Sequence, residues 1–167
     1  KYCFSYYFMI QIKYTKSQID AYFMRKIVIT SGFFNPIHVG HINLFREAKE
    51  LGDFLVVIVD NDGQVKAKNR VPFMRDTERV EVIKAVRYVD DVFLSIDKDV
   101  PIPESLKAVA KKHQGNELFF AKGGDRNINN IPESERKVCQ ELKIKVIDGV
   151  GGDKVQSSSW LLKNTIK

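Results

Sequence analysis

Residues 24–41 read MRKIVITSGFFNPIHVGH, and this stretch decides the fold of the 167-residue chain. Its charged start and the apolar run over 27–29 predict a β-strand that ends at Gly32. The loop 32–38 follows, and apolar residues at helical spacing over 40–51 predict a helix that Gly52 closes. A strand, a glycine-bearing loop and a helix in this order indicate the opening of an α/β domain.

Strands and helices alternate through the rest of the chain. The continuously apolar run 54–59 is typical of a buried parallel strand, and the turn-forming residues 60–63 end it. Further strands are predicted over 89–94, 118–121 and 145–148, with helices over 75–86, 104–113, 133–142 and from 157 onward. This alternation predicts one Rossmann-like, doubly wound parallel sheet of the α/β class, with ligands bound at the carboxyl ends of its strands.

The first 23 residues differ in composition from the rest, because they hold eight of the eighteen aromatic side chains. One interpretation makes residues 1–23 an extension upstream of a natural start at Met24, with residues 24–167 forming a single α/β domain. The other makes the segment an added strand or arm that packs on a neighbour, and a homodimer is left open. The length suits one core of ordinary size.

Composition limits the classes of partner. The net charge is +6, but Lys and Arg are spread along the chain without an arginine-rich tract, so we expect no nucleic-acid binding. A site that handles phosphates would also carry positive potential. No apolar run approaches the roughly 20 residues that span a bilayer, so no membrane partner is expected. Cys3 and Cys139 have neither metal-ligand nor disulfide-framework spacing, which favours a cytoplasmic location.

The loop between the first strand and the first helix has the chemistry of a phosphate site. A helix N-terminus presents free N–H groups and a partial positive charge, so it stabilises an anion. Gly40 lets the backbone approach a ligand, and His38 and His41 lie three residues apart on the rim of the helix. Two such imidazoles can donate hydrogen bonds to phosphate oxygens, although for an isolated pair a capping or packing role would be favoured.

The whole string resembles the signature of the cytidylyltransferase-like nucleotidyltransferases, a superfamily that also holds nicotinamide mononucleotide and pantetheine-phosphate adenylyltransferases. The resemblance is carried by His-x-Gly-His at 38–41 preceded by Gly-x-Phe-Asn-Pro-Ile at 32–37, and it extends from Lys26 to about Leu162. Residues 48–53 (AKELGD) and 87–92 (RYVDDV) are similar to stretches of bacterial glycerol-3-phosphate cytidylyltransferase and heptose-1-phosphate adenylyltransferase.

The resemblance implies roles for individual residues. Catalytic roles fall on His38, His41, Lys68 and Arg79, and nucleotide-binding roles on Phe33, Phe34, Gly40, Gly123, Asp125, Ser157, Ser158 and Ser159. Several have a structural alternative: Lys68 is one of several cations in a polar loop, Arg79 an arginine on a helix surface, and the serines ordinary caps of the last helix.

Two departures from the cytidylyltransferases bear on the base. Those enzymes carry Arg-Thr-Glu-Gly-Ile before the serine element, whereas residues 152–156 here are GDKVQ, so the arginine expected to read cytosine is missing. Residues 122–125, KGGD, resemble the heptose-phosphate adenylyltransferases instead. We therefore favour ATP over CTP as the donor.

The predicted reaction moves a nucleoside monophosphate from a nucleoside triphosphate to a small phosphorylated acceptor, such as a sugar or polyol phosphate, and releases pyrophosphate. In-line attack needs positioning and charge stabilisation but no covalent enzyme intermediate. Mg²⁺ would be held mainly by the triphosphate, since no carboxylate cluster predicts a protein metal site. The alternatives are a CTP-dependent enzyme, a catalytically inactive nucleotide-binding regulator and, weakest, a nucleic-acid-binding module.

Overall fold

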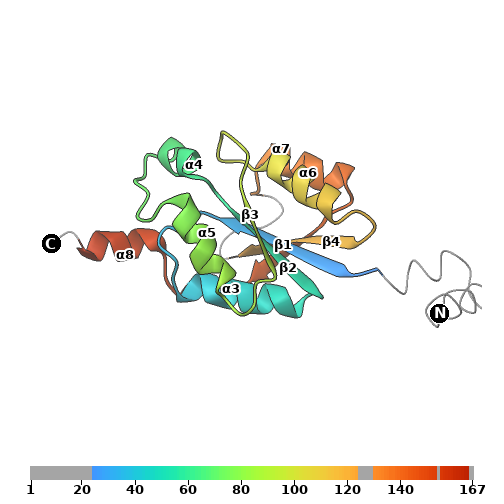
Figure 1. Cartoon of the computed structure of the whole chain (residues 1–167), viewed down its shortest axis with the longest axis horizontal. Coiled ribbons are helices and arrows are strands. Elements are labelled where there is room, and N and C mark those ends of the chain that lie inside the picture. Colours follow the sequence, from blue (N-terminus) through green and yellow to red (C-terminus); the bar gives the residue numbers. More distant parts are fainter. Residues whose placement is uncertain (1–23, 124–129, 154, 166–167) are drawn as a thin grey trace, which may run out of the picture.

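A five-stranded, fully parallel sheet forms the centre of the protein in this computed structural model, which describes residues 24–123, 130–153 and 155–165. The strands are β1 (Lys26–Gly32), β2 (Phe54–Val59), β3 (Asp91–Leu94), β4 (Glu117–Gly123) and β5 (Lys145–Val150). Their spatial order is β3-β2-β1-β4-β5, and every neighbouring pair is parallel (Figure 1). The α/β class and the Rossmann-like sheet predicted from the sequence are confirmed.

Helices cover both faces of the sheet. They are α3 (Val39–Glu50), α4 (Asp62–Ala67), α5 (Asp76–Lys84), α6 (Pro103–Lys112), α7 (Glu133–Glu141) and α8 (Ser158–Thr165). Figure 1 shows α3 and α5 on one side of the sheet and α6 and α7 on the other, while α8 extends away from the body. No helix in the described ranges combines the length and the apolar character that a membrane crossing requires.

Two hydrophobic cores explain this layering, because successive side chains of a strand point to opposite faces. Val28 and Val57 lie in the core that also holds Phe45 of α3 and Ile83 of α5. The alternate residues of the same strands belong to the second core, which includes Ile27, Ile29, Leu106 of α6 and Val138 of α7. Strands β1 and β2 are therefore apolar on both faces, as expected of strands buried in a parallel sheet.

The strand order creates a crevice between β1 and β4. From β1 the chain moves outward to β2 and β3, and α6 then carries it back across the sheet to β4. Adjacent strands whose connections leave in opposite directions open a ligand-binding crevice at their carboxyl ends. The loop after β1, the end of β4 and the segment between β5 and α8 all meet there.

Two local features differ from the sequence-based expectation. Residues 60–63 are predicted only as a turn, but residues 62–67 form the short helix α4 because Asn61 and Gln64 cap it reciprocally, each side chain accepting from the other's backbone N–H. Gly52 does follow the first helix, but it is required for close approach: a Cβ there would lie 2.7 Å from the Lys26 carbonyl oxygen.

Candidate active site

A pocket of about 390 Å³ lies at the carboxyl ends of β1 and β4. Most of the residues that the sequence singled out line it together, although they come from three separate segments: Phe33, Phe34, His38, Gly40, His41, Gly123, Ser157, Ser158 and Ser159. Asp125 lies outside the described residues, so its place in the site stays a prediction.

The two histidines form a stacked pair at the N-terminus of α3. Their ring centroids are 3.7 Å apart and their planes differ by 24°. The backbone N–H of His38 donates to His41 Nδ1 at 3.3 Å, so a neutral His41 carries its proton on Nε2 and offers that nitrogen as a donor. His38 Nδ1 is buried and has no hydrogen-bond partner among the described residues. An unpaired buried nitrogen beside a pocket fits a bound ligand.

Both imidazoles are uncharged at neutral pH in this environment. Burial lowers the pKa of His38 below its usual range. It lowers the pKa of His41 to about 3, with the charge on a protonated His38 as a second cause. A neutral imidazole still carries one N–H group, which can donate a hydrogen bond to a phosphate oxygen. Such a bond becomes stronger as negative charge develops on that oxygen.

A depressed histidine pKa makes stability depend on pH. Because the folded protein holds His41 neutral, the unfolded chain binds more protons below the ordinary pKa of 6.5, and stability falls as the pH is lowered toward 3. We expect His41 to account for a loss of about 3 kcal/mol in unfolding free energy by pH 4. Urea denaturation of the wild type and His41→Gln between pH 7 and pH 4 checks this. Equal pH dependence in the two proteins would contradict it.

Phe34 packs against His41. Its backbone has a φ of 49°, in the left-handed region that side chains other than glycine rarely adopt. The ring is 2% exposed and packs edge-on against His41 at 4.8 Å and against Phe45 of α3 at 5.2 Å. Only its backbone and ring edge can therefore face a ligand, and its main effect is to fix the position of His41.

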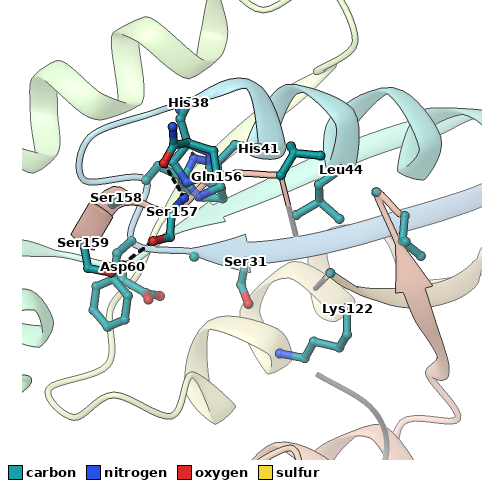
Figure 2. A pocket seen from close by; sticks show the side chains of 18 of the residues that line it. Ser31, His38, His41, Leu44, Asp60, Lys122, Gln156, Ser157, Ser158 and Ser159 are labelled. Carbon is teal, nitrogen blue, oxygen red and sulfur yellow. Dashed lines mark hydrogen bonds between the residues drawn. The ribbon is translucent and has the colours of Figure 1, made fainter. Parts of the chain in front are cut away.

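The serines place the N-terminus of α8 opposite that of α3. Ser157 Oγ accepts from the Trp160 N–H at 3.2 Å and lies 3.1 Å from Ser159 Oγ, while the Ser158 hydroxyl donates to the Pro36 carbonyl at 2.8 Å. The last contact ties α8 to the loop that carries the histidines. Figure 2 shows His38, His41 and the serines gathered on one side of the pocket. Two helix N-termini thus face one space, as suits a ligand with several phosphates.

Gly40 and Gly123 keep the pocket open at close contacts. A Cβ on Gly40 would lie 3.1 Å from the His38 ring, and one on Gly123 would lie 3.1 Å from both the Leu44 side chain and the Val150 carbonyl oxygen. A larger residue at either position would have to displace a wall of the pocket.

Lys68 and Arg79 are not brought to the pocket wall. Lys68 is exposed at the end of α4, whereas Arg70, two residues later, lines the pocket with its guanidinium carbon 5.9 Å from the centroid of the Phe33 ring. The sequence offered Arg70 only as one cation among several in the same polar loop. Arg70 is the additional candidate for phosphate contact, and the role of Lys68 stays a prediction.

Arg79 is buried, contrary to the solvated alternative considered for it, with 1% of its surface exposed. Its guanidinium donates to the carbonyl oxygens of Phe33 at 2.6 Å, Asp60 at 2.7 Å and Met74 at 3.2 Å, and pairs with the Asp62 carboxylate at 2.7 Å. These contacts join the loops after β1 and β2 to α5. Arg79 thus holds the loop after β1 through the Phe33 carbonyl, and a catalytic role for it stays a prediction.

The opposite wall holds a buried ion pair that the sequence did not reveal. Lys122 Nζ, at the end of β4, lies 3.0 Å from Glu135 Oε2 on α7, and the two side chains are 4% and 3% exposed. Lys122 entered the sequence reasoning only through the KGGD resemblance. Glu135 carried no signal, because an acidic residue in the first turn of a helix is an ordinary feature.

Comparison with known proteins identifies the family of the chain. The family described as cytidylyltransferase-like matches residues 29–158. The chain is 37% identical over 121 residues to an FAD synthase of Pyrococcus abyssi, an alignment that covers 72% of this chain and 77% of that protein. It is also 41% identical over 126 residues to the bifunctional protein HldE of Desulfatibacillum aliphaticivorans. That alignment covers 74% of this chain but only 24% of HldE.

A solved structure supports the same assignment. The lipopolysaccharide core biosynthesis protein of Thermoplasma volcanium GSS1 superimposes with a TM-score of 0.60 at 25% identity, over 75% of this chain and 94% of that one. The match of the family along most of the chain confirms the resemblance inferred from residues 32–41. The chain belongs to the cytidylyltransferase-like family and is a nucleotidyltransferase.

Proposed function

We propose that the protein transfers the adenylyl group of ATP to the phosphate of a small acceptor and releases pyrophosphate. The observation that carries this proposal is the stacked pair His38 and His41 at the N-terminus of α3, which shares one pocket with the serines at the N-terminus of α8. This arrangement suits a triphosphate whose α-phosphate lies at the histidines and whose outer phosphates lie at the serines.

The proposed reaction is a single in-line displacement. An oxygen of the acceptor phosphate attacks the α-phosphorus, the bond from that phosphorus to the bridging oxygen breaks, and pyrophosphate leaves with the electron pair. His38 and His41 would donate to the α-phosphate oxygens as their charge grows. No enzyme nucleophile is required, and the described cysteine, Cys139, is buried with its pKa raised to about 11 by burial.

The pocket fits a magnesium ion that arrives with the nucleotide. Its carboxylates among the lining residues are Asp60, Glu135 and Asp153, and no three His, Cys, Asp or Glu side chains in the described ranges are grouped to hold a metal. Mg²⁺ commonly uses one or two carboxylates together with substrate phosphates. When bound, it would supply further positive charge to the triphosphate.

We expect ATP to be at least as good a donor as CTP. The pocket-lining segment 150–153 presents mainly backbone groups, because it contains Gly151 and Gly152, whose φ values are 91° and 66°. No arginine follows this segment before Ser157. Backbone amides can read a base edge but lack the charged donor that favours the cytosine carbonyl. The measurement is kcat/KM for both triphosphates with one acceptor. A tenfold preference for CTP, about 1.4 kcal/mol, would contradict the adenylyl assignment.

For the acceptor we propose a sugar or polyol phosphate. Flavin mononucleotide is the second candidate, and the 37% identity to an FAD synthase is the observation that favours it. Pyrophosphate release measured with ATP and with glucose 1-phosphate, glycerol 3-phosphate or flavin mononucleotide tests both. Nucleotide binding without pyrophosphate release across the panel would indicate a regulatory protein instead.

A further inference from the structure

The buried pair Lys122–Glu135 lines the same pocket as the histidines and serines proposed to bind the triphosphate, but it comes from other elements, β4 and α7. Glu135 belongs to α7, which packs on the face of the sheet opposite α3. In the view of Figure 2, the pocket-lining Lys122 lies below β1 together with Ser31, whereas His38 and His41 lie above the strand. The pocket therefore has a phosphate wall and, facing it, a wall whose charged groups form an ion pair.

The surroundings of the pair are those of a hydrophobic core. Lys122 Nζ lies 3.8 Å from the centroid of the buried Phe120 ring, and Ile102 and Cys139 are 1% and 3% exposed. Taking two charges out of water is costly, and a well-packed apolar pair of similar volume is often as stable or more so. Stability alone gives little reason for an ion pair here. Its place on a pocket wall points instead to contact with a ligand.

The chemistry of the pair selects the kind of ligand. Glu135 Oε1 accepts from the Ile102 N–H at 3.3 Å and Oε2 from Lys122, and each carboxylate oxygen can accept a further hydrogen bond. A hydroxyl group both donates and accepts, so neighbouring hydroxyls can meet carboxylate and ammonium together. A second phosphate would be repelled by Glu135, and an alkyl chain would offer no polar group to the remaining hydrogen-bonding positions of the pair.

We infer that Lys122 and Glu135 bind the hydroxylated carbon chain or ring next to the acceptor phosphate. This inference rests on the proposed nucleotidyl transfer, in which the acceptor phosphate lies near His38 and His41; we place the rest of the acceptor at the wall that Lys122 and Glu135 form. The shared chemistry is a hydroxylated carbon skeleton, which a sugar phosphate, a polyol phosphate and the ribityl chain of flavin mononucleotide all contain.

The test compares acceptors with and without hydroxyls. Glucose 1-phosphate is paired with 2-deoxyglucose 1-phosphate, glycerol 3-phosphate with propyl phosphate, and flavin mononucleotide with an analogue that has an alkyl phosphate chain. The wild type should favour the hydroxylated member of the productive pair at least tenfold in kcat/KM, since a hydrogen bond to a charged group discriminates by about that factor or more. The productive pair identifies the source of the hydroxyls.

Two variants remove the pair in different ways. Glu135→Gln keeps the shape and loses the charge, and Lys122→Met with Glu135→Leu replaces the whole pair by apolar residues. Both should raise the acceptor KM about tenfold or more and abolish the preference for hydroxylated acceptors, while the KM for the triphosphate stays near that of the wild type. The matched control is Glu133→Gln with Lys137→Met, which removes an exposed ion pair of 2.9 Å on the same helix and should change neither constant.

The outcomes separate the two proposals. A double variant that keeps the wild-type acceptor KM and preference, whether or not its Tm changes, would show that the pair is structural and overturn the inference while leaving nucleotidyl transfer intact. An equal rise in the KM of acceptor and triphosphate would also overturn it, as would a wild type indifferent to the hydroxyls. Absence of pyrophosphate release by the wild type with every acceptor would overturn the proposed function and the inference with it.

Discussion

Replacing His41 by Asn is expected to lower kcat for nucleotidyl transfer roughly 100- to 1,000-fold, and His38→Asn to do the same. A donor aimed at a developing oxyanion contributes roughly 2.7 to 4 kcal/mol to transition-state stabilisation. The stacked rings, 3.7 Å apart at the N-terminus of α3, are the groups placed to make such contacts. Turnover is measured as pyrophosphate release with a saturating substrate pair.

Asparagine is chosen because His41 also has a structural role. Its Nδ1 accepts from the His38 N–H, and its ring packs against Phe34. Alanine would leave a void and an unpaired amide, so stability and rate would fall together.

The third histidine, His113, provides a matched control, because it lies at the end of α6 against Phe54 and does not line the pocket. His113→Asn should keep full turnover. Near-normal turnover in the His41 or His38 variant would remove that residue from the catalytic assignment.

Arg79→Met is expected to lower the unfolding free energy by about 3–5 kcal/mol. The substitution leaves the Asp62 carboxylate without its buried partner and three carbonyl oxygens without their donor, which is the costly way to break a buried pair. Turnover should fall as well, because Arg79 holds the Phe33 carbonyl in the loop that leads to His38. Urea denaturation monitored by circular dichroism measures the change.

The exposed Arg87, whose guanidinium carbon lies 4.7 Å from the centroid of the Tyr88 ring, is the control. Arg87→Met should stay within about 0.5 kcal/mol of the wild type, as most surface substitutions do. Arg79→Lys keeps the charge but cannot reproduce the planar fork, so its stability should lie between those of the wild type and Arg79→Met. An Arg79→Met protein that unfolds within about 1 kcal/mol of the wild type would show that these contacts are not stabilising.

The fold could be predicted from the sequence because its determinants are periodic and local. The apolar run of residues 54–59 could be read as a strand buried on both faces, and all six residues take part in β2. The alternation of strands and helices then led to a parallel sheet, since each crossover returns the chain to the same edge. The short helix α4 was missed because the Asn61–Gln64 capping box lies in a stretch of turn-forming residues.

The site was predictable where it depends on helix ends. His38, His41 and the serines lie at helix N-termini that could be placed from sequence, and parallel strands bring such termini to one edge of the sheet. Lys68 and Arg70 could not be separated in this way. They are two residues apart in one polar loop, and only the path of the chain after α4 places Arg70 rather than Lys68 at the pocket.

By itself the sequence determined the α/β sheet, the position of the loop after β1 and the family, because hydrophobic periodicity, helix ends and the motif at residues 32–41 each depend on residues close together in the chain. Only the tertiary structure decided that Arg79 is buried with its guanidinium bonded to several loops, and that Lys122 pairs with Glu135. Both features depend on groups that are distant along the chain. Arg79 reaches 46 residues back to the Phe33 carbonyl, and Glu135 reaches 33 residues back to Ile102. Such contacts have no fixed spacing in sequence, since the packing of α5 and α7 against the sheet creates them.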